Sequence, residues 1–182
     1  ILEKHLHDTY PKKKQLICQL ANRLDKPVGG LLFCAKKQSI LKDLQDKFFK
    51  RRVSKYYLAV DEGTPKKSKA LLENYLIKSN TQFRAVSASP ETPGVKIARL
   101  RYEVVCTQGD LCLLKIQIFT GKFHQIRFQL SCLGHPIWND EWYGAKRMIP
   151  SIKIGLYSYF LGFDEPKTEI RKEFRCLPEL SE

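Results

Sequence analysis

Apolar residues recur along the chain with two different periods, and each period predicts a different kind of element. Over residues 39–52 they fall three and four positions apart, which predicts an amphipathic helix with lysines and arginines on the opposite face. The apolar face comprises Ile40, Leu41, Leu44, Phe48 and Phe49. A shorter helix is expected over residues 124–133, ended by Gly134, which suits the left-handed conformation after a helix.

Most other apolar stretches alternate with polar residues or form short runs, and both patterns are typical of β-strands. Residues 53–61 alternate most clearly, with Lys55 and Tyr57 on one side and Tyr56 on the other. The run at 31–35 follows two glycines and predicts a buried strand. Further strands are expected at 71–78, 83–88, 95–106, 111–119, 152–163 and 169–174, with turns at 107–110 and 164–167.

Consecutive strands with few helices between them indicate an α+β fold, with a mixed, mainly antiparallel central sheet and flanking helices. The first twenty residues lack a clear period and are expected to form a short helix or arm followed by a loop. No repeat, low-complexity tract or linker divides the 182 residues, so a single domain over 1–182 is predicted.

Charge narrows the class of partner. The chain has 32 lysines and arginines against 19 acidic residues, a formal net charge of +13. Such an excess favours a polyanion such as nucleic acid, because each neutralised phosphate releases condensed counterions. A merely basic, soluble surface explains the charge about as well.

Cysteine and histidine spacing gives no sign of a metal site or a disulfide framework. The six cysteines are scattered without a CxxC pair, which favours free thiols in a reducing, cytoplasmic compartment. His5 and His7 form an isolated pair that we interpret as solvated rather than metal-bound. No apolar run of about 18 residues predicts a membrane span.

Two ionisable residues become informative when they are considered together. Asp25 alone has an ordinary interpretation, as an aspartate before a turn. Arg127 lies on an apolar helix face, and an inward guanidinium needs a carboxylate partner, for which Asp25 is one candidate. Such a pair would keep Asp25 ionised and ready to act as a nucleophile or a base.

Three ordered segments resemble the RluA-type pseudouridine synthases of ribosomal and transfer RNA. They are ArgLeuAsp with the following Gly and apolar run (23–36), LysTyrTyrLeuAlaVal (55–60), and GlyLysPheHisGlnIleArg with its continuation to AspGluTrpTyrGly (121–144). The resemblance implies a pseudouridine synthase catalytic core. It further implies an isomerase that flips out a uridine of structured rRNA or tRNA and rearranges its glycosidic bond, without a metal or small-molecule cofactor.

Matched residue by residue, the resemblance assigns three catalytic side chains. Asp25 corresponds to the catalytic aspartate and Arg127 to the basic residue that pairs with it. Tyr57 corresponds to the tyrosine that stacks on the target base, although a half-buried strand aromatic would also fit its position. Tyr56 is then expected to pack on the other side of the sheet.

Three more residues are assigned to substrate binding by the same resemblance. Arg23 would fill the gap left by the extruded nucleotide, or else contact phosphate at the surface. Ile126 and Leu130 would form the apolar wall of the uracil pocket, a position that a helix core explains nearly as well. His124 and Gln125 are expected to hold the start of the helix rather than to react.

Two departures from the family pattern qualify these expectations. Asn22 stands where a histidine is common, and Val28 and Gly29 replace a usual Thr and Ser. The upstream LysPro element and its strands have no counterpart in these residues, so either the N-terminal part is reduced or the chain is a fragment of something longer. We expect an N-terminally short core without a separate N-terminal RNA-binding domain, acting as a monomer. The alternative function is a catalytically inactive RNA-binding module on the same scaffold.

Overall fold

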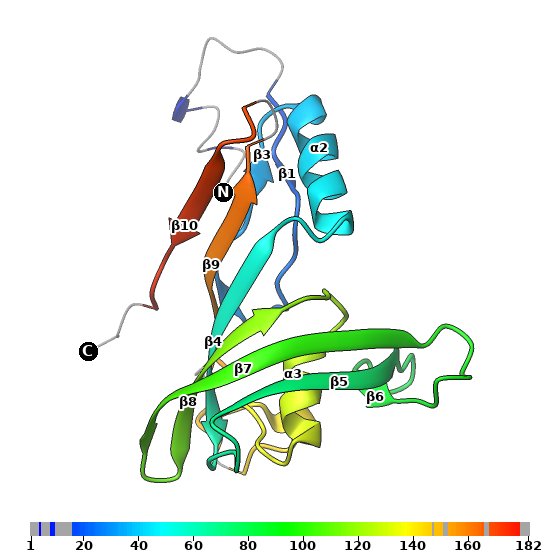
Figure 1. Cartoon of the computed structure of the whole chain (residues 1–182), viewed down its shortest axis with the longest axis vertical. Helices are drawn as coiled ribbons and strands as arrows, with labels where there is room; N and C mark the ends of the chain where they lie inside the picture. The colour runs from blue at the N-terminus through cyan, green and yellow to red at the C-terminus, as the bar shows by residue number, and fades with distance from the viewer. Residues whose placement is uncertain are drawn as a thin grey trace.

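A curved sheet forms the centre of the molecule. The computed structural model describes residues 4, 8–9, 16–146, 148–150, 153–165 and 168–178. Within them the strand order is β10-β9-β4-β8-β7-β5-β6 (Figure 1). The strands of this path are β4 (Ser54–Glu62), β5 (Lys69–Lys78), β6 (Ala85–Ser87), β7 (Lys96–Gln108), β8 (Leu111–Ile118), β9 (Leu156–Asp164) and β10 (Arg171–Arg175). All neighbours along it are antiparallel.

A segment near the N-terminal end of the described chain adds three short strands. β2 (Gly29–Gly30) pairs in parallel with β9, whereas β1 (Gln19–Leu20) pairs antiparallel with β3 (Cys34–Ala35). The parallel pair makes the sheet mixed, and the α+β prediction is confirmed. The strand predicted at 31–35 is wrong, because the chain changes strand partner between β2 and β3 and leaves Leu32 40% exposed.

One strand residue is the register partner of two functional segments. Ser158 of β9 lies opposite Gly30 of β2 and also opposite Tyr57 of β4. Gly30 has a φ of 115°, and a Cβ at this position would overlap the backbone of Ser158. Glycine is therefore required for the close approach of β2 to β9.

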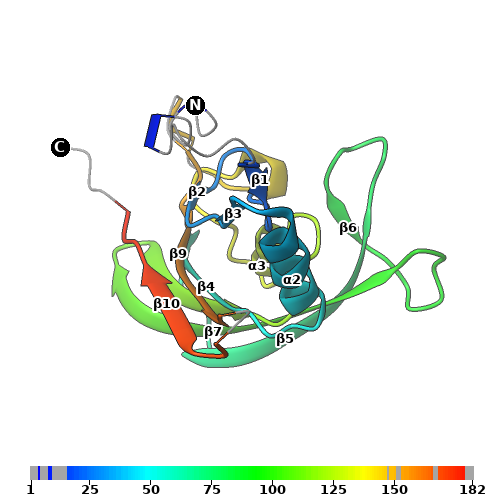
Figure 2. The same ribbon diagram turned by 90° about the horizontal axis from the view of Figure 1, so that it is seen from above.

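Two helices, α2 (Gln38–Phe49) and α3 (Gln125–Cys132), lie on the same side of the curved sheet (Figure 2). Ile126 and Leu130 of α3 belong to the main hydrophobic core with residues of β4, β7 and β8. Leu44 of α2 packs in a separate cluster with Val53 and Phe163. A 3-10 helix, η1 (Glu141–Tyr143), follows α3.

The predicted helix over 39–52 is confirmed, but two side chains were placed on the wrong face. Leu41 and Leu44 are buried as expected. Phe49, the last residue of α2, is 86% exposed although it was expected on the buried face. Lys47, expected on the solvated face, is buried and pairs with Glu169 at 3.5 Å.

The remaining elements differ from their predicted bounds mainly at the ends. Gly109 turns the β7–β8 hairpin with a φ of 56°, and Gly134 follows α3 with a φ of 86°, as predicted. β9 begins at Leu156 rather than at 152, and β1 had no clear signal. Most of the predicted arm at 1–20, both residues of the His5/His7 pair, Ile152 and positions 166–167 lie outside the described residues.

Two further observations bear on the predictions from composition. All six cysteines are free thiols, and the sulfurs of Cys18 and Cys34 lie 3.3 Å apart. Within the described part of the chain, every helix is too short or too polar to cross a membrane.

Candidate active site

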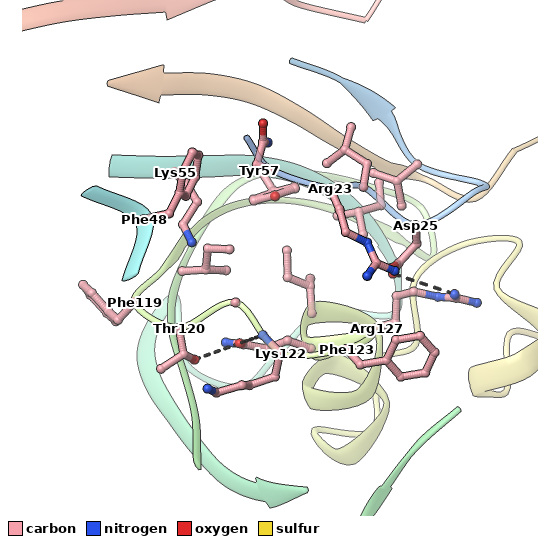
Figure 3. A pocket seen from close by; sticks show the side chains of 18 of the residues that line it. Arg23, Asp25, Phe48, Lys55, Tyr57, Phe119, Thr120, Lys122, Phe123 and Arg127 are labelled. Atoms are coloured by element: carbon pink, nitrogen blue, oxygen red, sulfur yellow. Dashed lines mark hydrogen bonds and ion pairs between the residues drawn. The ribbon is translucent and has the colours of Figure 1, made fainter. Parts of the chain in front are cut away.

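A cavity of about 630 Å³ opens on the helix side of the sheet (Figure 3). Its walls come from the segment 21–28, the end of α2, the start of β4 and the stretch from Ile118 to Arg127. These stretches are far apart in the sequence, and the fold brings them together at one place. The cavity is therefore the natural candidate for a functional site.

The three predicted catalytic residues meet in this cavity. Asp25 comes from the segment after β1, Tyr57 from β4 and Arg127 from α3, and all three line the cavity wall. A distance of 4.0 Å separates Arg127 Nη1 from Asp25 Oδ2. The convergence that the sequence interpretation required is thus present in the fold.

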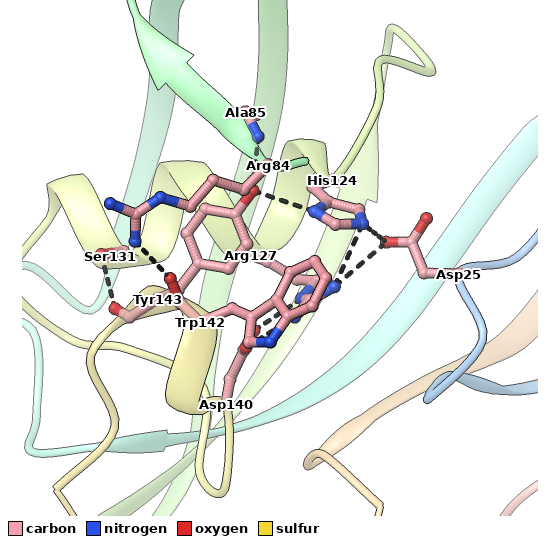
Figure 4. Close-up of polar contacts among 9 residues, drawn as sticks. All are labelled: Asp25, Arg84, Ala85, His124, Arg127, Ser131, Asp140, Trp142 and Tyr143. Atoms are coloured by element: carbon pink, nitrogen blue, oxygen red, sulfur yellow. Dashed lines mark hydrogen bonds and ion pairs between the residues drawn. The ribbon is translucent and has the colours of Figure 1, made fainter. Parts of the chain in front are cut away.

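The main partner of Arg127 is a residue to which the sequence analysis gave no role. Asp140 accepts hydrogen bonds from Arg127 Nε at 2.6 Å and Nη2 at 2.7 Å, with both side chains almost fully buried (Figure 4). Two parallel bonds fix the plane of a guanidinium. As a result, Nη1 is the guanidinium nitrogen left facing Asp25.

His124 supports the same guanidinium from the other side. Its Nε2 lies 3.2 Å from Arg127 Nη1, and an arginine can only donate, so Nε2 accepts. Nδ1 must then carry the proton and donate to the Tyr143 hydroxyl at 3.0 Å, which also accepts from the Ala85 amide. Burial, helped by the Arg127 and Lys78 charges, lowers the pKa of His124 to about 4, so the ring is neutral near pH 7.

Burial and the neighbouring arginines act in opposite directions on the pKa of Asp25. Burial raises the pKa of Asp25 above its usual range, and Asp140 adds to the effect, whereas Arg127 and Arg23 oppose it. The sequence interpretation expected Arg127 to dominate and to hold the carboxyl ionised. The direction of the shift is opposite to the one that Arg127 alone would produce, because Arg127 is bound mainly to Asp140 and faces Asp25 only at 4.0 Å.

Tyr57 and Tyr56 point to opposite sides of β4, as predicted. Tyr57 is 7% exposed and lines the cavity. Burial, followed by the nearby Asp25 charge, raises the pKa of Tyr57 to about 12, so the phenol is neutral. Tyr56 packs edge-on against Phe160 with ring centroids 5.3 Å apart.

Of the predicted substrate-binding residues, two line the cavity and one does not. Arg23 is exposed at the cavity edge near Asp25, and Ile126 forms part of the wall (Figure 3). Leu130 is fully buried in the core and is not among the described lining residues, which favours its alternative interpretation as a helix-core residue. Ile118 and Leu156 supply apolar wall that the sequence analysis did not identify.

Two side-chain amides hold the loops that carry these residues. Gln125 Oε1 accepts hydrogen bonds from the Thr120 hydroxyl at 2.7 Å and the Lys122 amide at 3.0 Å, as expected for a residue that holds the start of α3. Asn22 Oδ1 accepts a bond from the Phe33 amide at 2.8 Å and so ties together the two ends of the segment that carries Asp25. Neither amide contacts Asp25 or Tyr57.

Among the described residues, no group of three or more His, Cys, Asp and Glu side chains lies close enough together to hold a metal ion.

Comparison with known proteins identifies the class. A family model described as RNA pseudouridylate synthase matches residues 2–132. The chain therefore belongs to this family, and the resemblance noted in the sequence is confirmed.

Individual relatives agree with the family match. The chain is 30% identical over 161 residues to ribosomal large subunit pseudouridine synthase D of Borreliella burgdorferi, covering 88% of this chain and 49% of that protein. It is 32% identical over 157 residues to ribosomal large subunit pseudouridine synthase C of Vibrio vulnificus, covering 83% and 49%. The chain thus spans about half the length of the curated relatives it matches.

A solved structure shows that the fold is shared. The human protein titled RNA Pseudouridylate Synthase Domain Containing 1 superposes with a TM-score of 0.78 at 24% identity. The match covers 98% of this chain and 74% of the human one.

Proposed function

We propose that this chain is the catalytic core of an RNA pseudouridine synthase that isomerises specific uridines in rRNA or tRNA. The observation that carries the proposal is the convergence of Asp25, Tyr57 and Arg127 on one cavity of a chain that belongs to the family. The names of its relatives, ribosomal large subunit synthases C and D, support rRNA as the first substrate to test.

The reaction leaves the composition of the RNA unchanged. The bond from the ribose C1′ to uracil N1 breaks, the base turns, and C1′ bonds to C5; a proton leaves C5 and a proton is gained at N1. None of this can occur inside a base-paired stack, so the uridine must be extruded at a cost of about a few kcal/mol. Arg23, exposed at the cavity edge, would fill the vacancy and contact phosphate.

Asp25 is the proposed catalytic carboxylate. It either attacks the sugar or the base covalently, or abstracts a sugar proton to give an unsaturated intermediate. Both routes use the ionised form, and burial makes that form more basic than a solvated aspartate. In either route Arg127 acts as a positioning residue, because Asp140 and His124 hold Nη1 beside Asp25.

Tyr57 and Ile126 would keep the base in place while it is detached. The Tyr57 ring stacks on the uracil and Ile126 closes the apolar side. Holding the two fragments in one cavity turns their recombination into an oriented, intramolecular step. Because the Tyr57 hydroxyl stays protonated near pH 7, the ring carries no negative charge that would act on the detached base.

The test compares the parent chain with the Asp25→Asn variant. Each is incubated with rRNA and tRNA, and pseudouridine is mapped chemically. We expect the variant to form no product while its RNA affinity stays within about twofold of the parent, since one uncharged replacement removes no phosphate contact.

Two outcomes would contradict the proposal. Equal modification by Asp25→Asn would remove Asp25 from the mechanism. Binding without modification by the parent on every RNA tested would favour the inactive RNA-binding module instead.

A further inference from the structure

Three cations gather at one end of the cavity, which we call the cation end: Arg51, Lys55 and Lys122. They come from three segments: the turn after α2, strand β4 and the loop before α3. Figure 3 shows Lys55, beside Phe48, on the opposite side of the cavity from Asp25 and Arg127. The proposed reaction uses none of these three side chains.

The three charges lie close enough to repel one another. Burial, followed by the charges of Lys122 and Arg51, lowers the pKa of Lys55 to about 8. Burial, followed by Lys96 and Arg51, also lowers the pKa of Lys122. Lys55 Nζ lies against the loop before α3, where a Cβ built on Gly121 would be 3.4 Å away. The cation end thus concentrates positive charge in a partly buried place.

The described residues supply no carboxylate that could neutralise this charge. Among the described residues, no carboxylate comes within 4.0 Å of Arg51, Lys55 or Lys122, although many basic residues elsewhere have such a partner. Asp25 is the single acidic residue among the described lining residues. Lys55 and Lys122 are half-buried, Arg51 is exposed, and none has a counterion among the described residues, so together they favour an anionic ligand.

Aromatic side chains narrow the kind of anion. Four phenylalanines line the same cavity: Phe48, Phe49, Phe119 and Phe123. Phe49 is 86% exposed at the end of α2, and a large ring so open to water is available to a ligand. Cations interleaved with aromatic rings are the arrangement that binds single-stranded nucleic acid, phosphates on the charges and bases on the rings.

We propose that Arg51, Lys55 and Lys122 form a subsite for a backbone phosphate of the RNA strand that carries the target uridine, with Phe49 stacking on an adjacent base. The inference rests on the proposed function, because it takes RNA as the ligand of the cavity. A uridine extruded toward Asp25 stays bonded to phosphates on both sides. The RNA strand on one side of the uridine must therefore leave the cavity along a wall that can bind its phosphates. The cations Arg51, Lys55 and Lys122 provide such a wall.

The experiment measures RNA affinity without chemistry. In the Asp25→Asn background, binding of fluorescein-labelled decauridylate is followed by anisotropy for Lys55→Gln, Lys122→Gln and the control Lys66→Gln, an exposed lysine in the β4–β5 loop. We expect each cavity variant to bind roughly tenfold more weakly, as for a lost hydrogen bond to a charged group. The slope of log affinity against log salt should fall by about 0.7 for each, and Lys66→Gln should change little.

Two further readouts separate binding from structure. If the subsite exists, parent affinity falls as pH rises through about 8, because Lys55 loses its proton, and Lys55→Arg reduces this dependence. The charged groups facing Lys55 are Arg51 and Lys122, and Lys96 faces Lys122, so a residual slope from Lys122 is expected. Lys55→Gln should unfold at the same temperature as the parent or higher, because it relieves repulsion.

The contrary results are distinct from those of the isomerisation test. An equal loss of RNA affinity in Lys55→Gln and in the Lys66→Gln control would show that the cation end contributes only general surface charge, and would overturn the subsite. A lower unfolding temperature for Lys55→Gln would indicate a structural lysine and also overturn it. Specific losses in a chain that forms no pseudouridine would support the subsite and count against the enzyme.

Discussion

The two ends of the cavity treat positive charge in opposite ways. Arg127 is held by two short bonds to Asp140 and by the neutral ring of His124. Lys55 and Lys122, at the cation end, have no carboxylate partner within the described chain, and their pKa values are lowered. Arg127, whose charge Asp140 neutralises, is suited to position Asp25. Lys55 and Lys122, which lack a carboxylate partner among the described residues, are suited to bind an anion from solution.

The largest difference between the two ends should appear in stability. Arg127→Ala leaves Asp140 buried without its partner and should lower the free energy of unfolding by about 3–5 kcal/mol. Lys55→Gln should leave that free energy unchanged or raise it. Urea unfolding at pH 7 measures the free energy of unfolding of both variants. An equal decrease in the two variants would contradict the proposed difference between the two ends of the cavity.

A second contrast concerns two buried acids, Asp140 with a partner and Asp61 without one. Asp61 on β4 is fully buried beside Tyr102 and Cys112, and its carboxyl oxygens have no hydrogen-bond partner within the described chain. Burial raises the pKa of Asp61 to about 8 from a usual 3.8, so the folded state holds a proton that the unfolded state releases. The contribution of Asp61 to the free energy of unfolding should therefore be fully present below about pH 4. It should fall by up to roughly 1.4 kcal/mol per pH unit as the pH rises toward 8.

Asp61→Asn tests this contribution. The amide has a similar shape and does not titrate in this range, so the free energy of unfolding should depend less steeply on pH between 5 and 8. The measurement is urea unfolding at several pH values for parent and variant. An unchanged pH dependence would show that Asp61 is not the responsible group.

The smallest expected effect separates the two interpretations of Arg23. If Arg23 fills the vacancy left by an extruded base, Arg23→Ala should reduce modification roughly tenfold for a uridine in a stem and only about threefold for the same uridine in a single strand. Lys122→Gln, at the cation end, should affect both RNAs alike. Equal losses for Arg23→Ala on the two RNAs would make it a phosphate contact.

Elements with one clearly buried side could be predicted from the sequence. β4, the β7–β8 hairpin and α3 were predicted near their observed bounds, because alternation and helical spacing reflect a single buried face. The run at 31–35 could not be predicted in this way, since its backbone follows the approach of Gly30 to β9 rather than its own apolar pattern. Phe49 shows a related limit, because apolar spacing does not show where α2 ends.

The sequence predicted the main residues of the site but not the hydrogen bonds and packing that hold them in place. Resemblance to the family supplied Asp25, Tyr57 and Arg127, which the fold brings to one cavity. Asp140 was missed although a buried Arg127 requires a carboxylate, because sequence alone cannot rank two candidate acids. Leu130 shares a helix face with Ile126, but only the first turn of α3 reaches the cavity, and that depends on how the helix packs on the sheet.

Ser158 of β9 links the segment that carries Asp25 to the strand that carries Tyr57. Ser158 is the register partner of both Gly30 and Tyr57, so the segment that carries Asp25 and the strand that carries Tyr57 pair with the same residue of β9. The segment that carries Asp25 and the strand that carries Tyr57 are therefore held relative to each other by backbone pairing with β9.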